Sequence, residues 1–181
     1  MAASVFDAES AIRTVVAPNW REFTRAQGSP EDSSIIFAPG IVSRESIGIS
    51  RQMACEGSAS LTLMSSIQRE FYRSQNISKY EDRYLLIMTP EAGCIWQGKA
   101  LLGEINSKGG LITLHNNASG FVITHEIGHT LGLGHSNLMS CANNANDGAW
   151  GRNCRAIEYG GAIDVMGNVD TTSPLSTYHQ W

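Results

Sequence analysis

Residues 124–136 read THEIGHTLGLGHS. Five residues of this stretch have the spacing HExxHxxGxxH, namely His125, Glu126, His129, Gly132 and His135. Because an α-helix turns by ~100° per residue, His125 and His129 lie one turn apart on the same helical face. Two imidazoles at this spacing can bind one metal ion, and the pattern is typical of zinc.

The remaining residues of the motif complete a catalytic site. Glu126 lies beside the ligand face, where its carboxylate can reach a metal-bound water without displacing a ligand. A helix cannot return His135 to the same ion, so the chain must turn, and Gly132 permits the positive φ that a sharp turn needs. Three neutral imidazoles leave a fourth zinc position for water, whose pKa falls toward ~7. We therefore predict one zinc ion, three histidine ligands and Glu126 as general base.

These residues resemble the metzincin zinc endopeptidases, whose second signature is a methionine in a tight turn beneath the metal. Met166 lies in the glycine-bounded segment 159–167 and has a long loop in which to return beneath the histidines. Met139 is the alternative, but it follows His135 by only four residues. We predict Met166 as the Met-turn residue. Asp164 either orients this segment or simply forms its turn.

Within this clan, the chain most resembles the gametolysin or autolysin family, which digests extracellular glycoprotein and cell-wall material. The likeness covers roughly residues 20–181. It is specific at the zinc motif, at the Met166 segment and at Cys94, Trp96 and Gly98. Gly161 departs from the family pattern, where we expect Asp. No Tyr stands two residues after Met166, so the tyrosine ligand of astacin-like and serralysin-like relatives is not expected here.

The resemblance implies an α+β fold with two subdomains around a cleft. Residues 1–135 would form an N-terminal subdomain with a mixed twisted sheet and helices. One of these helices carries His125 and His129 and is called the zinc helix below. Residues 136–181 would form an irregular C-terminal subdomain with the Met-turn and a final helix. A length of 181 residues, of which 42% are hydrophobic, agrees with a single metalloprotease catalytic domain over residues 1–181.

Composition excludes several other classes of protein. The formal net charge is -4 and there is no run of Lys or Arg, which argues against a nucleic-acid partner. No stretch approaches the ~20 apolar residues of a membrane span. The first residues lack the features of a signal peptide, so we expect the sequence to begin after processing. We expect a secreted monomer that binds protein or peptide substrate in extended form.

The four cysteines are even in number and form no CxxC pair, which favours disulfides in an oxidising compartment. The alternative is four buried free thiols in a cytosolic protein. Of the three possible pairings, the family resemblance implies Cys55 with Cys94 and Cys141 with Cys154.

Apolar periodicity places the other elements. It predicts helices over 7–25, with a break or kink near Pro18, and over 58–74. It predicts strands over 33–42, 84–88, 100–105 and 111–114. Ser119 is the predicted cap of the zinc helix, and Ser173 with Pro174 begins the final helix. The strand over 100–105 is expected above the zinc helix with a free edge, on which an extended substrate can pair.

These features predict a zinc-dependent endopeptidase. In the expected mechanism zinc polarises the scissile carbonyl, and Glu126 takes the proton of the water and returns it to the leaving amine. A zinc-stabilised matrix-binding module without turnover is the first alternative, against which the intact Glu126 argues. The second is a zinc hydrolase acting on another kind of bond. We expect His115, His179, Trp96 and Trp150 to be structural.

Overall fold

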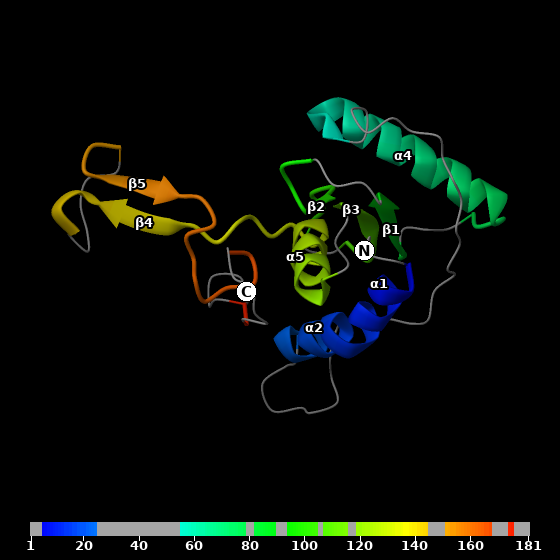
Figure 1. Ribbon diagram of the computed structural model, residues 1–181, viewed down its shortest axis with the longest axis horizontal. Coiled ribbons are helices and arrows are strands. Elements are labelled where there is room, and N and C mark those ends of the chain that lie inside the picture. The colour runs from blue at the N-terminus through cyan, green and yellow to red at the C-terminus, as the bar shows by residue number, and fades with distance from the viewer. Residues whose placement is uncertain are drawn as a thin grey trace.

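The computed structural model describes residues 5–24, 55–78, 82–89, 94–104, 107–115, 119–144, 151–167 and 174–175. Helices and strands are mixed, as an α+β fold requires, and helices lie on both faces of a small sheet (Figure 1). The predicted strand over 33–42 and the final helix predicted beyond Pro174 fall outside the described residues, as do Trp150 and His179.

The central sheet has three strands in the order β1-β3-β2. β1 (Tyr84–Thr89) runs parallel to β3 (Gly110–His115), and β2 (Gly98–Ala100) runs antiparallel to β3 at one edge. The strands predicted over 84–88 and 111–114 are therefore confirmed.

The strand predicted over 100–105 is wrong in its extent, since the pairing of β2 ends at Ala100. Leu101 N–H still donates to the carbonyl of Leu111 at 3.2 Å, but from Gly103 onward the backbone has other partners. Gly103 N–H donates to the carbonyl of His129 at 3.0 Å, and Glu104 N–H donates to Ser107 Oγ at 2.9 Å. A Cβ at Gly103 would collide with the carbonyl of Thr130, so the chain is drawn onto the zinc helix instead of continuing along the sheet.

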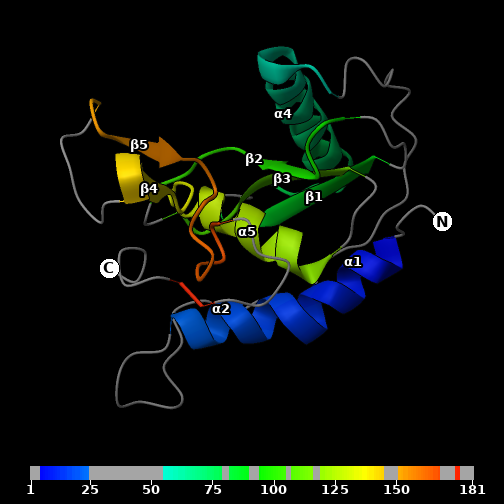
Figure 2. The ribbon, with the colours of Figure 1, turned by 60° about the vertical axis from the view of Figure 1, so that its left-hand side comes forward.

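Residues of β3 alternate between two packed faces, as the period of a strand requires. Ile112 packs against α5 (Gly120–Thr130), whereas Leu111 packs against Met64 of α4 (Gly57–Ser74). The sheet is thus covered by α4 on one face and by α5 with the N-terminal helices on the other, as Figure 2 shows. The amphipathic helix predicted over 58–74 is confirmed.

The N-terminal helical segment consists of α1 (Val5–Ala11), the π-helical turn η1 (Ile12–Val16) and α2 (Ala17–Phe23). A break or kink is predicted near Pro18; the chain stays helical through this residue, and the irregularity is the wider turn just before it. There, Ala17 N–H bonds to the carbonyl of Ile12. Because proline clashes with the carbonyl four residues earlier, a locally wider turn accommodates it. No described helix is long and apolar enough to span a membrane.

A second, two-stranded sheet follows the zinc motif, where an irregular chain was expected. β4 (Leu138–Cys141) pairs antiparallel with β5 (Cys154–Ile157), and the short helix η2 (Ala142–Asn144) follows β4. Figure 1 shows this ribbon beside the main body. Its side chains are largely exposed, so no apolar alternation marked it in the sequence.

The structure contains both disulfides that the resemblance implied. Cys55–Cys94 links the start of α4 to the segment that leads into β2, and Cys141–Cys154 joins directly opposed residues of β4 and β5. In the described part of the chain no cysteine is free. Disulfides of this kind are typical of oxidising compartments.

Replacing Cys141 and Cys154 together by Ser should lower the free energy of unfolding by about 3 kcal/mol, because the bond closes a loop over a separation of 13 residues. The matched pair Cys55→Ser and Cys94→Ser should cost slightly more, since its separation is 39 residues. Urea unfolding measures both changes. Four reactive thiols in denatured, unreduced wild type would contradict the pairing.

Candidate metal centre

The zinc motif begins on α5, which ends at Thr130. His125 and His129 lie on adjacent turns with their ring centroids 4.8 Å apart and their planes nearly perpendicular. Ser119 is in the N-cap position, as predicted, but its side chain makes no capping hydrogen bond. Its carbonyl accepts from Ile123 N–H at 3.1 Å, a backbone bond that closes the first helical turn.

The chain reverses after α5 at Gly132, whose φ is 85°. Gly132 N–H donates to the carbonyl of His129, and Leu133 N–H donates to the carbonyl of Gly128, both at 3.0 Å. These bonds satisfy carbonyls at the helix end. They require a residue in the left-handed conformation, which glycine adopts freely. The reversal carries His135 back toward His129, and the Nε2 atoms of these two residues are 3.1 Å apart.

The three imidazoles are held in one orientation by hydrogen bonds at Nδ1, each 2.8 Å long. The acceptors are the carbonyl of Val165 for His125, the carbonyl of Leu133 for His129, and Glu158 Oε1 for His135. Carbonyl and carboxylate oxygens accept hydrogen bonds, so each Nδ1 carries the proton and each Nε2 keeps its lone pair.

This arrangement suits a cation bound at Nε2. One nitrogen from each of the three histidines lies within 4.8 Å of the others. Burial lowers the pKa of His125 to about 4 and also lowers the pKa of His129, so both are neutral and able to ligate at neutral pH. Two lone pairs that face each other repel, and a shared cation removes that repulsion. Three imidazoles are a donor set that zinc accepts.

Glu126 lies on the same helix but outside the set of ligand atoms. It is only 5% exposed, and within the described part of the chain its buried Oε2 has no hydrogen-bond partner. A Cβ at Gly98 of β2 would lie 2.6 Å from Glu126 Oε1, so the carboxyl group rests against the edge strand. Burial raises the pKa of Glu126 to about 8. A buried carboxyl oxygen without a protein partner remains able to accept a hydrogen bond from a water or a bound ligand.

Met166 lies beneath the zinc helix and is fully buried. Its sulfur occupies the space that a side chain at Gly128 would need. Asp164 is also buried, and its Oδ1 accepts a hydrogen bond from Met166 N–H at 2.7 Å. This single bond both forms the turn and orients Met166, so the two roles considered for Asp164 are compatible. The competing residue, Met139, is 45% exposed on β4.

Gly161, which departs from the family pattern, is explained by a close backbone approach. Its N–H donates to the carbonyl of Ser136 at 3.0 Å, and any Cβ there would collide with the Ser136 side chain. Ser136 N–H in turn donates to the carbonyl of Met166 at 2.8 Å. The residue that follows His135 is therefore bonded to both ends of the Met166 segment.

Two residues of the site were missed by sequence reasoning. Glu158 bonds His135, and the Tyr159 ring centroid is 3.8 Å from that of His135 and 6.0 Å from that of His125. Both follow β5, which returns the chain from the hairpin to the histidines. Only the sequence Tyr-Gly-Gly before Met166 hinted at them, because the hairpin that positions them was not predicted.

The other residues considered have structural contacts. His115 Nε2 accepts from Cys94 N–H at 3.1 Å, and the Trp96 ring lies 5.6 Å from that of His115. Cys55, Cys94 and His115 also lie within ligand distance of one another, but both sulfurs are used in the disulfide. They therefore do not form a second metal site.

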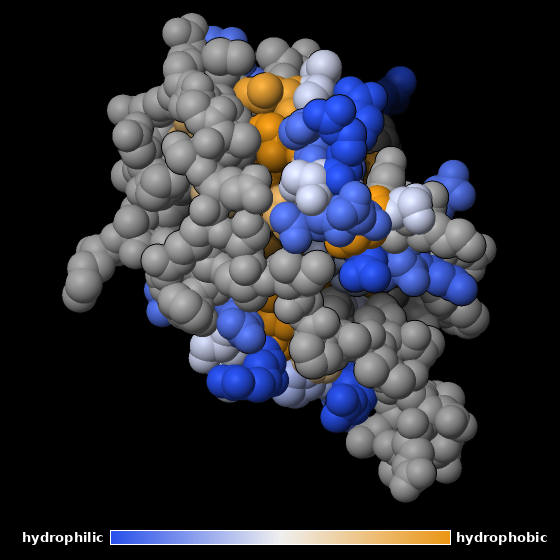
Figure 3. Space-filling view, turned by 90° about the vertical axis from the view of Figure 1, so that its right-hand side faces the viewer, coloured by the Kyte–Doolittle hydropathy of each residue, from blue (hydrophilic) through white to orange (hydrophobic). Residues whose placement is uncertain are grey.

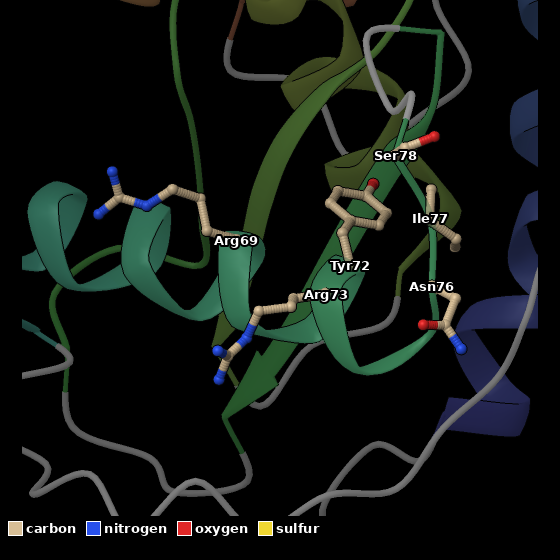
Figure 4. Close-up of a pocket in the computed structure, with 6 residues that line it drawn as sticks. All are labelled: Arg69, Tyr72, Arg73, Asn76, Ile77 and Ser78. Atoms are coloured by element: carbon tan, nitrogen blue, oxygen red, sulfur yellow. The ribbon is translucent and has the colours of Figure 1, made fainter.

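A hollow of about 400 Å³ at the end of α4 is remote from this chemistry, as it lies on the opposite face of the sheet (Figure 4). It is lined by Arg69, Tyr72, Arg73, Asn76, Ile77 and Ser78. Arg73 is paired with Glu70 at 2.6 Å and is exposed. Where residues are described, Figure 3 shows a surface with many polar groups and smaller apolar areas between them.

Residues 88–169 match the family described as dual-action HEIGH metallo-peptidase. The letters of that description stand in this chain at residues 125–129. The match runs from the end of β1 to just past Met166, so it contains the whole histidine cluster. No curated protein and no solved structure matches significantly. The matching family is of the metzincin type and indicates a metallopeptidase.

Replacing Glu158 by Gln should weaken zinc binding about tenfold, because the amide is a poorer partner for the Nδ1–H of His135. Glu158 is solvent-exposed, so we expect the lower end of the usual range. Competition with a chromophoric chelator measures the affinity. Glu9→Gln, exposed on α1, is the matched control, and an equal affinity of the two variants would exclude the role of Glu158.

In the metal-free protein, the stability of wild type relative to Glu126→Gln should fall as the pH rises. Because the pKa of Glu126 is raised from 4.5 to about 8, its contribution is fully present below pH 4.5 and is lost progressively toward pH 8. Relative to Glu126→Gln, chelator-treated wild type should lose at most about 3 kcal/mol between pH 4.5 and 7. Urea unfolding at several pH values tests this. Parallel pH profiles for the two proteins would refute it, since the contribution of His125 is common to both.

Proposed function

We propose that this protein is a zinc-dependent endopeptidase, with His125, His129 and His135 as ligands of one zinc ion and Glu126 as the general base. The observation that carries the proposal is the convergence of three Nε2 lone pairs beside a buried carboxyl oxygen that has no protein partner. Met166, packed against α5 at Gly128, would be the Met-turn residue beneath the metal. The family match supports metallopeptidase chemistry at these residues.

Zinc at this site would supply a Lewis acid that polarises the scissile carbonyl and a water of lowered pKa. Glu126 accepts the proton of that water through Oε2, which is buried but free to bond. Burial makes Glu126 a stronger base than an exposed glutamate, although the charge of a bound metal would offset part of this effect. The same carboxyl group then returns the proton to the leaving amine, without a covalent enzyme intermediate.

The edge strand β2 is the proposed site for substrate backbone. β3 pairs with one side of β2, and no strand among the described residues pairs with its other side. Gly98 of this strand lies against Glu126, so a peptide added to the edge would pass directly beside the base. Pairing of this kind binds the peptide main chain and holds the scissile carbonyl in position.

The remaining proposals concern context. We place the activity in one catalytic domain over residues 1–181, with the C-terminal subdomain starting at residue 136. The two disulfides support an extracellular location, and the likeness to the gametolysin or autolysin family favours extracellular or cell-wall proteins as substrates. We propose a monomer.

Cleavage of casein by wild type and by Glu126→Ala, each with one zinc ion per chain by elemental analysis, tests the function. Wild type should cleave, and the variant should be slower by at least about a hundredfold, because it retains the ligands and loses the base. Glu9→Ala is the matched control on a remote helix. Inactivity of both zinc-loaded proteins would favour the matrix-binding module, and equal activity would exclude Glu126 as the base.

A further inference from the structure

Tyr159 is the aromatic residue that closes over the histidine cluster. Its ring lies 3.8 Å from the ring of His135, with a tilt of 35°, and 6.0 Å from the ring of His125, with a tilt of 28°. The residue is 38% exposed, so it covers these imidazoles and also reaches solvent. A substrate carbonyl that approached the histidines from solvent would therefore pass beside this ring.

The backbone at Tyr159 is held in a conformation that is unfavourable for its type. Its φ is 59°, in the left-handed region that Gly and Asn adopt more easily than a bulky aromatic residue. Two hydrogen bonds fix it: Tyr159 N–H donates to Asn137 Oδ1 at 3.2 Å, and Gly160 N–H donates to the carbonyl of Ile157 at 3.1 Å. Backbone strain of this kind concentrates at functional sites, where the side chain has a use that a relaxed residue would not supply.

The hydroxyl group of Tyr159 is within electrostatic reach of the base. Burial, then the charge of Glu158 and then that of Glu126 raise the pKa of Tyr159. An ordinary phenol is already neutral at pH 7 and can donate a hydrogen bond. The ring therefore lies against two of the proposed ligands and carries a hydrogen-bond donor that is neutral at pH 7.

We propose that the Tyr159 hydroxyl donates a hydrogen bond to the oxyanion that forms from the scissile carbonyl. This inference rests on the proposed endopeptidase function. Tyr159 keeps its proton throughout, while the proton of the attacking water passes through Glu126 to the leaving amine. A donor aimed at developing negative charge lowers the barrier more than it strengthens substrate binding. Astacin-like and serralysin-like relatives carry a tyrosine two residues after the Met-turn methionine, and this chain has none there. Tyr159, which follows β5, would supply a phenol from another part of the chain.

Tyr159→Phe separates this role from simple ring packing, because Phe retains the stacked ring and removes only the hydroxyl. We expect kcat to fall about a hundredfold with KM nearly unchanged. Zinc affinity, measured by chelator competition, should stay within about twofold of wild type, because all three ligands and their Nδ1 partners are unchanged. Tyr72→Phe, at a buried tyrosine of α4, is the matched control and should behave as wild type.

A binding measurement tests the same contact without turnover. A peptide phosphinate has a tetrahedral, anionic centre, and its affinity for zinc-loaded Tyr159→Phe should fall by a factor similar to that in kcat, whereas the affinity for a product peptide should not change. Wild-type kcat and phosphinate affinity in Tyr159→Phe would overturn the inference and leave the endopeptidase function intact. A wild type that cleaves no protein would instead refute the proposed function, and the inference with it.

Discussion

The reversal of the chain at Gly132 determines where every later part of the site lies. α5 can align only His125 and His129, and a third ligand from the same segment requires a left-handed residue immediately past the helix. The reversal also frees the carbonyl of Leu133 to accept from His129, so the turn that delivers His135 orients a second histidine. The same few residues therefore set both the position of one ligand and the rotation of another.

The Met166 segment supports this reversal from below. The carbonyl of Val165 accepts from His125, and the carbonyl of Met166 accepts from Ser136, so adjacent peptide groups hold both ends of the motif. Because these contacts use main-chain atoms, many substitutions nearby are compatible with them, provided that glycine stands where backbones meet. Gly128 and Gly161 are such positions. The packing thus explains why the segment combines glycines with one large apolar residue.

Sequence reasoning succeeded where a local rule acts and failed where tertiary contacts decide. The helical period placed His125 and His129, and the special conformation of glycine placed the turn at Gly132. The end of β2 could not be predicted from the sequence. It is set by the hydrogen bond from Gly103 N–H to the carbonyl of His129, a contact between distant parts of the chain. Tyr159 was missed for a related reason: an exposed hairpin without apolar alternation returns it to the histidines.

The electrostatics of the site couple metal binding to folding. Burial favours neutral imidazoles at His125 and His129 and a protonated carboxyl at Glu126, so the metal-free site is arranged around uncharged groups. Three converging lone pairs and an unsatisfied buried oxygen are unfavourable without a cation and its water. A divalent ion held by these histidines would remove both costs at once and would favour the ionised form of Glu126 that the proposed mechanism needs. The binding free energy of such an ion would therefore contribute directly to the stability of the turn that creates the site.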